Sequence, residues 1–143
     1  MKIKILPAIA FVAAPYLFIW LGHFIFRYYF NDVTFSSNKV SLGTAISSYA
    51  GTTIAILIAA LTFVIGIRNN NMVKIRKYGY MASIVVMYSF TFVELGALFL
   101  TGILLISNIN GIPLATISLF IAIASFIHIC LLLMQLFLLA SKK

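Results

Sequence analysis

The stretch Tyr78–Ser107, YGYMASIVVMYSFTFVELGALFLTGILLIS, decides the fold. At ~1.5 Å per helical residue it is long enough to cross the ~30 Å hydrocarbon core of a bilayer. It carries a single acid, Glu94, near its middle. A second apolar run, Leu114–Ala140, follows after a short turn-like link, NINGIP, and carries His128 near its own middle. Two ionisable groups in apolar runs are therefore the main departure from plain hydrophobic helix.

The composition requires lipid as the main solvent of this chain. Its 143 residues are 64% hydrophobic and 8% charged, with a mean hydropathy of +1.16. Ordinary soluble chains are roughly 45–50% apolar and about 25% charged. A backbone in lipid must satisfy its own hydrogen bonds, and continuous rather than alternating apolar runs select helices over a barrel. The lone Cys130 excludes an intrachain disulfide. We therefore predict an all-α integral membrane protein.

Two further spans precede these runs. Ile5–Phe26 follows a basic MKIK start and is longer than the apolar core of a typical signal peptide, so we interpret it as an uncleaved transmembrane helix. A polar external loop, 27–47, leads to the next span, which ends at the basic link RNNNMVKIRK, 68–77. The sequence thus predicts one four-transmembrane-helix bundle over 1–143, with spans at about 5–26, 48–67, 78–107 and 114–140.

Basic residues are distributed unevenly between the two sides of this bundle. The N-terminus, the link 68–77 and the C-terminus carry most of the ten Lys and Arg residues, whereas the loop 27–47 carries few. This bias places both termini in the cytoplasm and predicts a multi-pass protein of the bacterial inner membrane. The same anchoring explains the formal net charge of +8 without direct nucleic-acid binding.

Glu94 and His128 are predicted to lie at the same depth. Each is separated from the link between the last two spans by a distance of roughly 21–22 Å along its helix. A charge at the bilayer centre costs at least ~2.5–3.5 kcal/mol, so such an acid faces protein or water. We expect Glu94 to contact His128, or its copy in a neighbouring subunit. The pair then either locks the bundle or belongs to a proton or cation path. Gln135 is expected to make an interhelical hydrogen bond or to lie at the surface.

Small residues recur at helical spacing in three of the spans and predict packing faces. Small faces let helix backbones approach closely in lipid. They are Gly51, Ala55, Ala59, Thr62 and Gly66 in the second span, Ala97 and Thr101 in the third, and Ser118, Ala122 and Ser125 in the fourth.

The basic link has two interpretations that are compatible with each other. Its four cations suit anionic lipid headgroups, and they also suit an acidic face of a cytosolic protein partner; they are Arg68, Lys74, Arg76 and Lys77. Neither a phosphate loop nor a HExxH or GxSxG motif is present, and Cys and His residues lack metal-ligand spacing. We therefore expect no enzyme activity, no metal and no cofactor.

Three families have a similar layout. Small four-span drug exporters share the size and a single intramembrane glutamate, but theirs lies in the first span, whereas Glu94 lies in the third. Membrane immunity proteins against pore-forming colicins share the general layout. The chain also resembles the membrane subunit of the Kiwa anti-phage system in its four spans, its basic link RNNNMVKIRK and its internal termini. That resemblance implies a homo-oligomer, such as a tetramer, that recruits a cytosolic DNA-binding effector.

The functional prediction is a non-enzymatic inner-membrane subunit that oligomerises and docks a cytosolic partner. In this interpretation it is the membrane sensor or anchor of an anti-phage defence complex. The alternatives are an immunity protein against a pore-forming toxin, and a small ion or proton channel or transporter that uses Glu94.

Overall fold

A computed structural model describes residues 6–30, 38–66, 70–78, 80–107 and 113–141. Within these ranges the chain is all-helical and contains no strand. The helices are α1 (Leu6–Tyr29), α2 (Lys39–Gly66), α3 (Asn70–Lys77), α4 (Met81–Ile106) and α5 (Leu114–Ser141). All but α3 are long and apolar enough to cross a membrane. The predicted fold class, an all-α bundle with four membrane-spanning helices, is confirmed.

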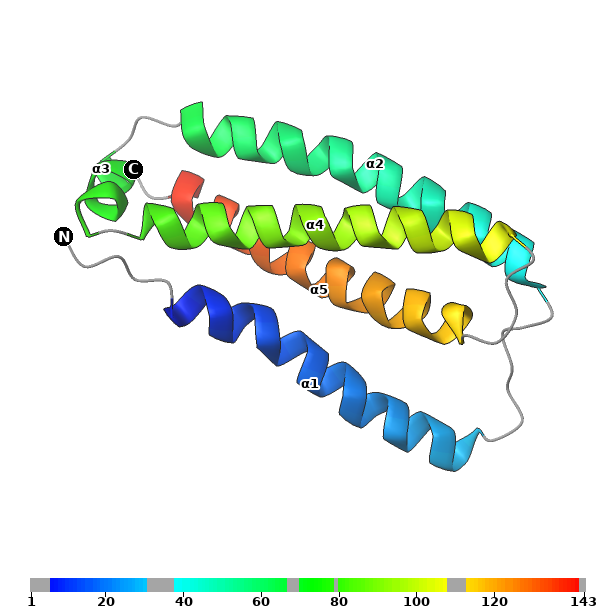
Figure 1. The fold of residues 1–143 in the computed structure, drawn as a ribbon. Helices are drawn as coiled ribbons and strands as arrows, with labels where there is room; N and C mark the ends of the chain where they lie inside the picture. The colour runs from blue at the N-terminus through cyan, green and yellow to red at the C-terminus, as the bar shows by residue number, and fades with distance from the viewer. Residues whose placement is uncertain (1–5, 31–37, 67–69, 79, 108–112, 142–143) are drawn as a thin grey trace.

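The four long helices run side by side along one direction (Figure 1). The main contacts of α4 are with α2 and α5, and α1 packs against α4 and α5. The start of α1, the short helix α3 and the end of α5 lie at the same end of the bundle (Figure 1). This arrangement follows from an even number of spans joined by short links. It also gathers the cations of α3 at one end.

α2 and α4 pack through complementary heptad-like faces. Buried residues on each helix recur at alternating steps of three and four, the spacing of a coiled-coil seam, with one step of seven at the end of the α2 series. On α2 they are Gly43, Ile46, Ala50, Thr53, Leu57 and Val64. On α4 they are Tyr88, Thr91, Leu95, Leu98, Gly102 and Leu105.

Two glycines set the closest approach of α2 to α4. A Cβ atom added at Gly43 would lie 2.6 Å from the backbone oxygen of Gly102, and one added at Gly102 would lie 3.0 Å from the backbone oxygen of Gly43. Such contacts are too short for any side chain. The absence of side chains at both positions is therefore what lets the two backbones meet.

Within one chain, the predicted small-residue face of α2 is exposed rather than packed. The residues that it comprised are exposed: Gly51, Ala55, Ala59, Thr62 and Gly66. The larger side chains of Ile46 and Leu57, on another face, bury more apolar surface against α4. In α4, Ala97 is also exposed and Thr101 is half-buried, with its hydroxyl donating to the Leu98 carbonyl.

The predicted packing residues of the last span are more deeply buried than those of α2. Ser118 and Ser125 are fully buried in α5, and Ala122 is half-buried.

The boundaries of the helices also differ in places from those predicted. α2 begins at Lys39, inside the predicted loop 27–47, because Gly43 and Ile46 continue the seam with α4. The link 68–77 contains the helix α3, and Arg68 lies outside the described residues.

Candidate functional site

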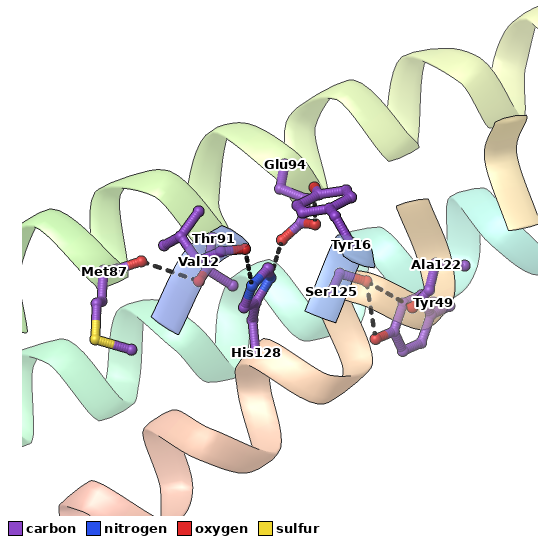
Figure 2. A network of polar contacts seen from close by, with 9 residues as sticks. All are labelled: Val12, Tyr16, Tyr49, Met87, Thr91, Glu94, Ala122, Ser125 and His128. Carbon is purple, nitrogen blue, oxygen red and sulfur yellow. Dashed lines mark hydrogen bonds and ion pairs between the residues drawn. The ribbon is translucent and has the colours of Figure 1, made fainter. Parts of the chain in front are cut away.

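A polar network occupies the middle of the bundle, where α1, α4 and α5 meet (Figure 2). Its core is the pair Glu94 and His128, each near the middle of its helix. The Nδ1 atom of His128 lies 2.8 Å from Oε2 of Glu94. His128 is 1% exposed and Glu94 is 5% exposed. The structure thus brings together, within one chain, the two groups that the sequence predicts to lie at the same depth in the membrane.

α1 supplies two further members of this network. The hydroxyl of Tyr16 donates to Oε1 of Glu94. The Nε2 atom of His128 lies 3.2 Å from the backbone oxygen of Val12. Glu94 therefore has a partner on each carboxyl oxygen, and His128 has a partner on each ring nitrogen (Figure 2). The network joins three helices that are distant in sequence.

Sequence reasoning did not find Tyr16 or the Val12 carbonyl. Tyrosine is common in membrane spans, and a backbone carbonyl carries no sequence signature of its own. The one available signal is the neighbouring Pro15, which lies inside α1. A proline disrupts the hydrogen-bond ladder of the preceding turn, and in lipid such turns gain partners from neighbouring helices. A contact from His128 to that turn agrees with this rule.

Aromatic rings and apolar side chains shield the pair from its surroundings. The ring of His128 lies between Tyr16, at a centroid distance of 5.8 Å, and Phe90, at 6.0 Å. Thr91, buried beside them, donates its hydroxyl to the carbonyl of Met87 and so does not compete for the carboxylate. Tyr16 is the most accessible member of the network, at 36% exposed.

A second, neutral contact joins α2 to α5 one turn from His128. The Ser125 hydroxyl donates to the carbonyl of Ala122 at 2.9 Å. The hydroxyl of Tyr49 lies 3.3 Å from the Ser125 oxygen. Because the Ser125 hydrogen is already donated, Tyr49 must be the donor in this contact. The buried stripe of α5 thus contributes one polar contact to α2 and another to α1 and α4.

Gln135 makes an interhelical hydrogen bond, which is one of the two possibilities that the sequence leaves open; the other is a surface position. Its Nε2 atom donates to the sulfur of Met87 in α4 at 3.5 Å. Its Oε1 atom is buried and has no partner among the described residues. A sulfur acceptor is weak, so this contact holds α5 to α4 less firmly than the Glu94–His128 pair does.

The predicted docking residues are described only in part. Lys74 and Lys77 are exposed on α3. The side chain of Arg76 and the whole of Arg68 lie outside what the structure describes. Among the described residues, no three His, Cys, Asp or Glu side chains gather as a metal site would require. The chemistry that the network itself can perform is the transfer of a proton between Glu94 and His128.

Comparison with known proteins assigns the family. Residues 6–143 match the RexB family, described as "Membrane-anchored ion channel, Abi component", where Abi denotes abortive infection. The chain is 52% identical to protein rexB of Escherichia phage lambda over 137 residues, which cover 96% of this chain and 95% of that protein. No solved structure matches it.

These matches correct one prediction and support a coarser one. The family is RexB and not that of the Kiwa membrane subunit, which the layout of the chain resembles. The broader prediction of a multi-pass membrane subunit of an anti-phage system is confirmed. With a match over almost its whole length and more than half of the aligned residues identical to those of a named member, the chain belongs to the RexB family of membrane-anchored ion channels of abortive infection.

Proposed function

We propose that this chain is a non-enzymatic, ion-conducting subunit of an abortive-infection system in the bacterial inner membrane. The observation that carries the proposal is the buried Glu94–His128 pair, held at mid-span by three helices. Intramembrane ionisable groups generally mark ion or proton pathways. The family description supplies the same class of activity. An immunity protein against a pore-forming toxin is the weaker alternative, because that function does not require the ion-channel activity that the family description names.

The conduction path in this proposal follows the interface of α1 with α4 and α5. α1 is the least buried of the long helices, with 11% of its apolar window buried against 33% for α4. The α2–α4 seam is closed by large side chains and by the Gly43–Gly102 contact. Separation of helices therefore costs least at α1, and the polar groups that ions would meet lie on that side.

Both ring nitrogens of His128 already have partners, which argues against an enzyme. A catalytic histidine directs one ring nitrogen at a substrate or a nucleophile, whereas Nε2 of His128 lies against the backbone carbonyl of Val12. Cys130, the chain's single thiol, is exposed on α5. We propose that the pair acts on protons and on helix position rather than on a bound substrate.

The first experiment measures ion flux in liposomes that contain the purified chain. We expect flux above that of empty liposomes, and a fall of about tenfold in Glu94→Gln, equivalent to ~1.4 kcal/mol. A glutamine at this position accepts from Tyr16 and donates to His128, so it keeps the contacts but removes the ionisable group. Tyr49→Phe removes a hydroxyl from the α2–α5 contact, outside the network, and should leave flux unchanged. Wild-type flux equal to that of empty liposomes would reject conduction by this chain alone.

We further propose that the basic end of the bundle faces the cytoplasm and docks an acidic protein partner. Lys74 and Lys77 support this because they are exposed at the end where α1 begins and α5 ends (Figure 1). The double variant Lys74→Glu, Lys77→Glu should lose a protein that co-purifies with the native chain, while its membrane insertion persists. Lys39→Glu, at the start of α2 and the opposite end, is the control. Equal recovery of the partner with both variants would contradict docking at α3.

A further inference from the structure

The hydrogen bonds of His128 fix how many protons the network holds. The carbonyl oxygen of Val12 can only accept, so Nε2 of His128 must carry a hydrogen. Tyr16 donates its hydroxyl hydrogen to Oε1 of Glu94. One hydrogen is then needed between Nδ1 and Oε2, at a separation of 2.8 Å. This hydrogen belongs either to the imidazolium or to the carboxylic acid, and the pair is neutral overall in both forms.

We propose that Glu94 and His128 form a binding site for one exchangeable proton, and that this proton, which joins α4 to α5, holds both residues in place for the two hydrogen bonds that dock α1. The proton moves between Oε2 and Nδ1 without changing the net charge. Such movement requires no rearrangement, because donor and acceptor exchange roles within one hydrogen bond. The ligand of the site is a proton, and α1 is the element that its occupancy positions.

Any other proton count breaks the docked geometry. Loss of the shared proton sets the lone pair of Nδ1 against the Glu94 carboxylate and leaves a net negative charge at mid-span. Gain of a second proton sets two hydrogens against each other and leaves a net positive charge. Either charge is unfavourable in the bilayer centre and draws water or movement of α1. Tyr16 is the titratable group that faces the pair from α1, and Tyr49 of α2 bonds Ser125 instead.

α1 depends on this site more than the other helices do. Its two hydrogen bonds to the network come from the Tyr16 side chain and the Val12 backbone. A ring contact between His23 and Phe120, with centroids 4.7 Å apart, adds a contact toward the other end of α1. The inference deepens the proposed function, because release of α1 is how the pair would open a path. Proton count and helix position are measurable without any conduction, so failure of the two proposals is distinguishable.

The first test counts the protons by NMR in lipid nanodiscs. The chain contains one glutamate and two histidines, so ¹³C-glutamate and ¹⁵N-histidine labels report the site almost uniquely. His23→Gln assigns the remaining signals to His128. We expect Nε2 to be protonated, and one hydrogen to be shared between Nδ1 and the Glu94 carboxyl. A bare Nε2, an ionised Glu94 facing a bare Nδ1, or a protonated Glu94 facing an imidazolium would each overturn the proposal.

The second test measures the position of α1 by electron–electron double resonance. Nitroxides replace the exposed residues Phe24 on α1 and Leu100 on α4, with Cys130→Ser, and labelled chains are diluted with unlabelled ones. Tyr16→Phe should raise the undocked population about threefold to tenfold, within the range of interhelical hydrogen bonds in membranes. Tyr49→Phe makes the same chemical change in the α2–α5 contact and should leave the distance between the two nitroxides unchanged.

Two substitutions at Glu94 compare a side chain that imitates the protonated carboxyl group with one that lacks any polar group. Glu94→Gln imitates the carboxylic acid and should keep α1 docked, whereas Glu94→Ala leaves Tyr16 and His128 without acceptor or donor and should release it. A distance distribution that is the same in Glu94→Ala, Tyr16→Phe and the parent would show that α1 is held by apolar packing alone, and would overturn the docking role.

Discussion

At the scale of single residues, the chain keeps two ionisable groups in lipid by making them neutral together. An isolated charge at the bilayer centre costs about 2.5–3.5 kcal/mol or more. Glu94 and His128 avoid that cost because each polar atom has a partner and the pair has no net charge. The stability of the site therefore depends on complete pairing rather than on the presence of an acid.

Complete pairing gives a prediction for the stability of substitutions at Glu94. Glu94→Ala removes the partner of the Tyr16 hydroxyl and of the buried Nδ1 of His128, and it should lower the free energy of unfolding by about 1–3 kcal/mol. Glu94→Gln preserves both contacts and should change it by less than ~1 kcal/mol. Unfolding by SDS titration in mixed micelles measures both values. Equal losses in the two variants would mean that the ionised form itself, and not the hydrogen bonding, stabilises the bundle.

At the scale of the helices, hydropathy predicted the four spans, but helix-face patterns predicted packing only in part. The spans follow from local composition, which one sequence contains in full. The face that packs depends on the partner helix. The sequence predicts a packing face along Gly51–Gly66 and a loop over 27–47, whereas Gly43, inside that loop range, begins the α2–α4 seam. The contact between Glu94 and His128 could be predicted because both residues lie at the same depth. The contact of Tyr16 could not, because it depends on where α1 packs.

The α2–α4 crossing predicts opposite results for two glycine substitutions. Gly43→Ala places a Cβ atom 2.6 Å from the Gly102 carbonyl oxygen, and the backbone cannot move aside without opening the seam. Overpacking of this kind should cost about 1–3 kcal/mol of unfolding free energy. Gly96→Ala in α4 meets nothing within 4 Å and should be neutral or slightly stabilising. Detergent melting curves compare the two, and a neutral Gly43→Ala would show that the helices cross elsewhere.

At the scale of the whole molecule, one chain leaves a large share of its apolar surface for lipid or for other copies. Exposed Phe, Ile and Leu side chains cover α1 and much of the outer faces of the other helices. The small-residue face of α2 differs from these surfaces because it has little side-chain area to offer lipid. Close helix approach is the use that such faces serve in membranes. We therefore propose that the self-association predicted from the sequence uses this face.

Self-association through α2 predicts that bulk on its small-residue face will separate the copies. Leucine at Ala55 and Ala59 would hold a second helix away from the backbone, because both positions are exposed and unoccupied within one chain. Native mass spectrometry in detergent should then show monomers where the parent shows oligomers. Ala45→Leu, also exposed on α2 but before the stretch 51–66, should leave the oligomer intact. If conduction needs several copies, the Ala55→Leu, Ala59→Leu variant should also lose ion flux while its helix content stays constant. Loss of flux with the oligomer intact would instead place the effect within a single bundle, at the α1 interface.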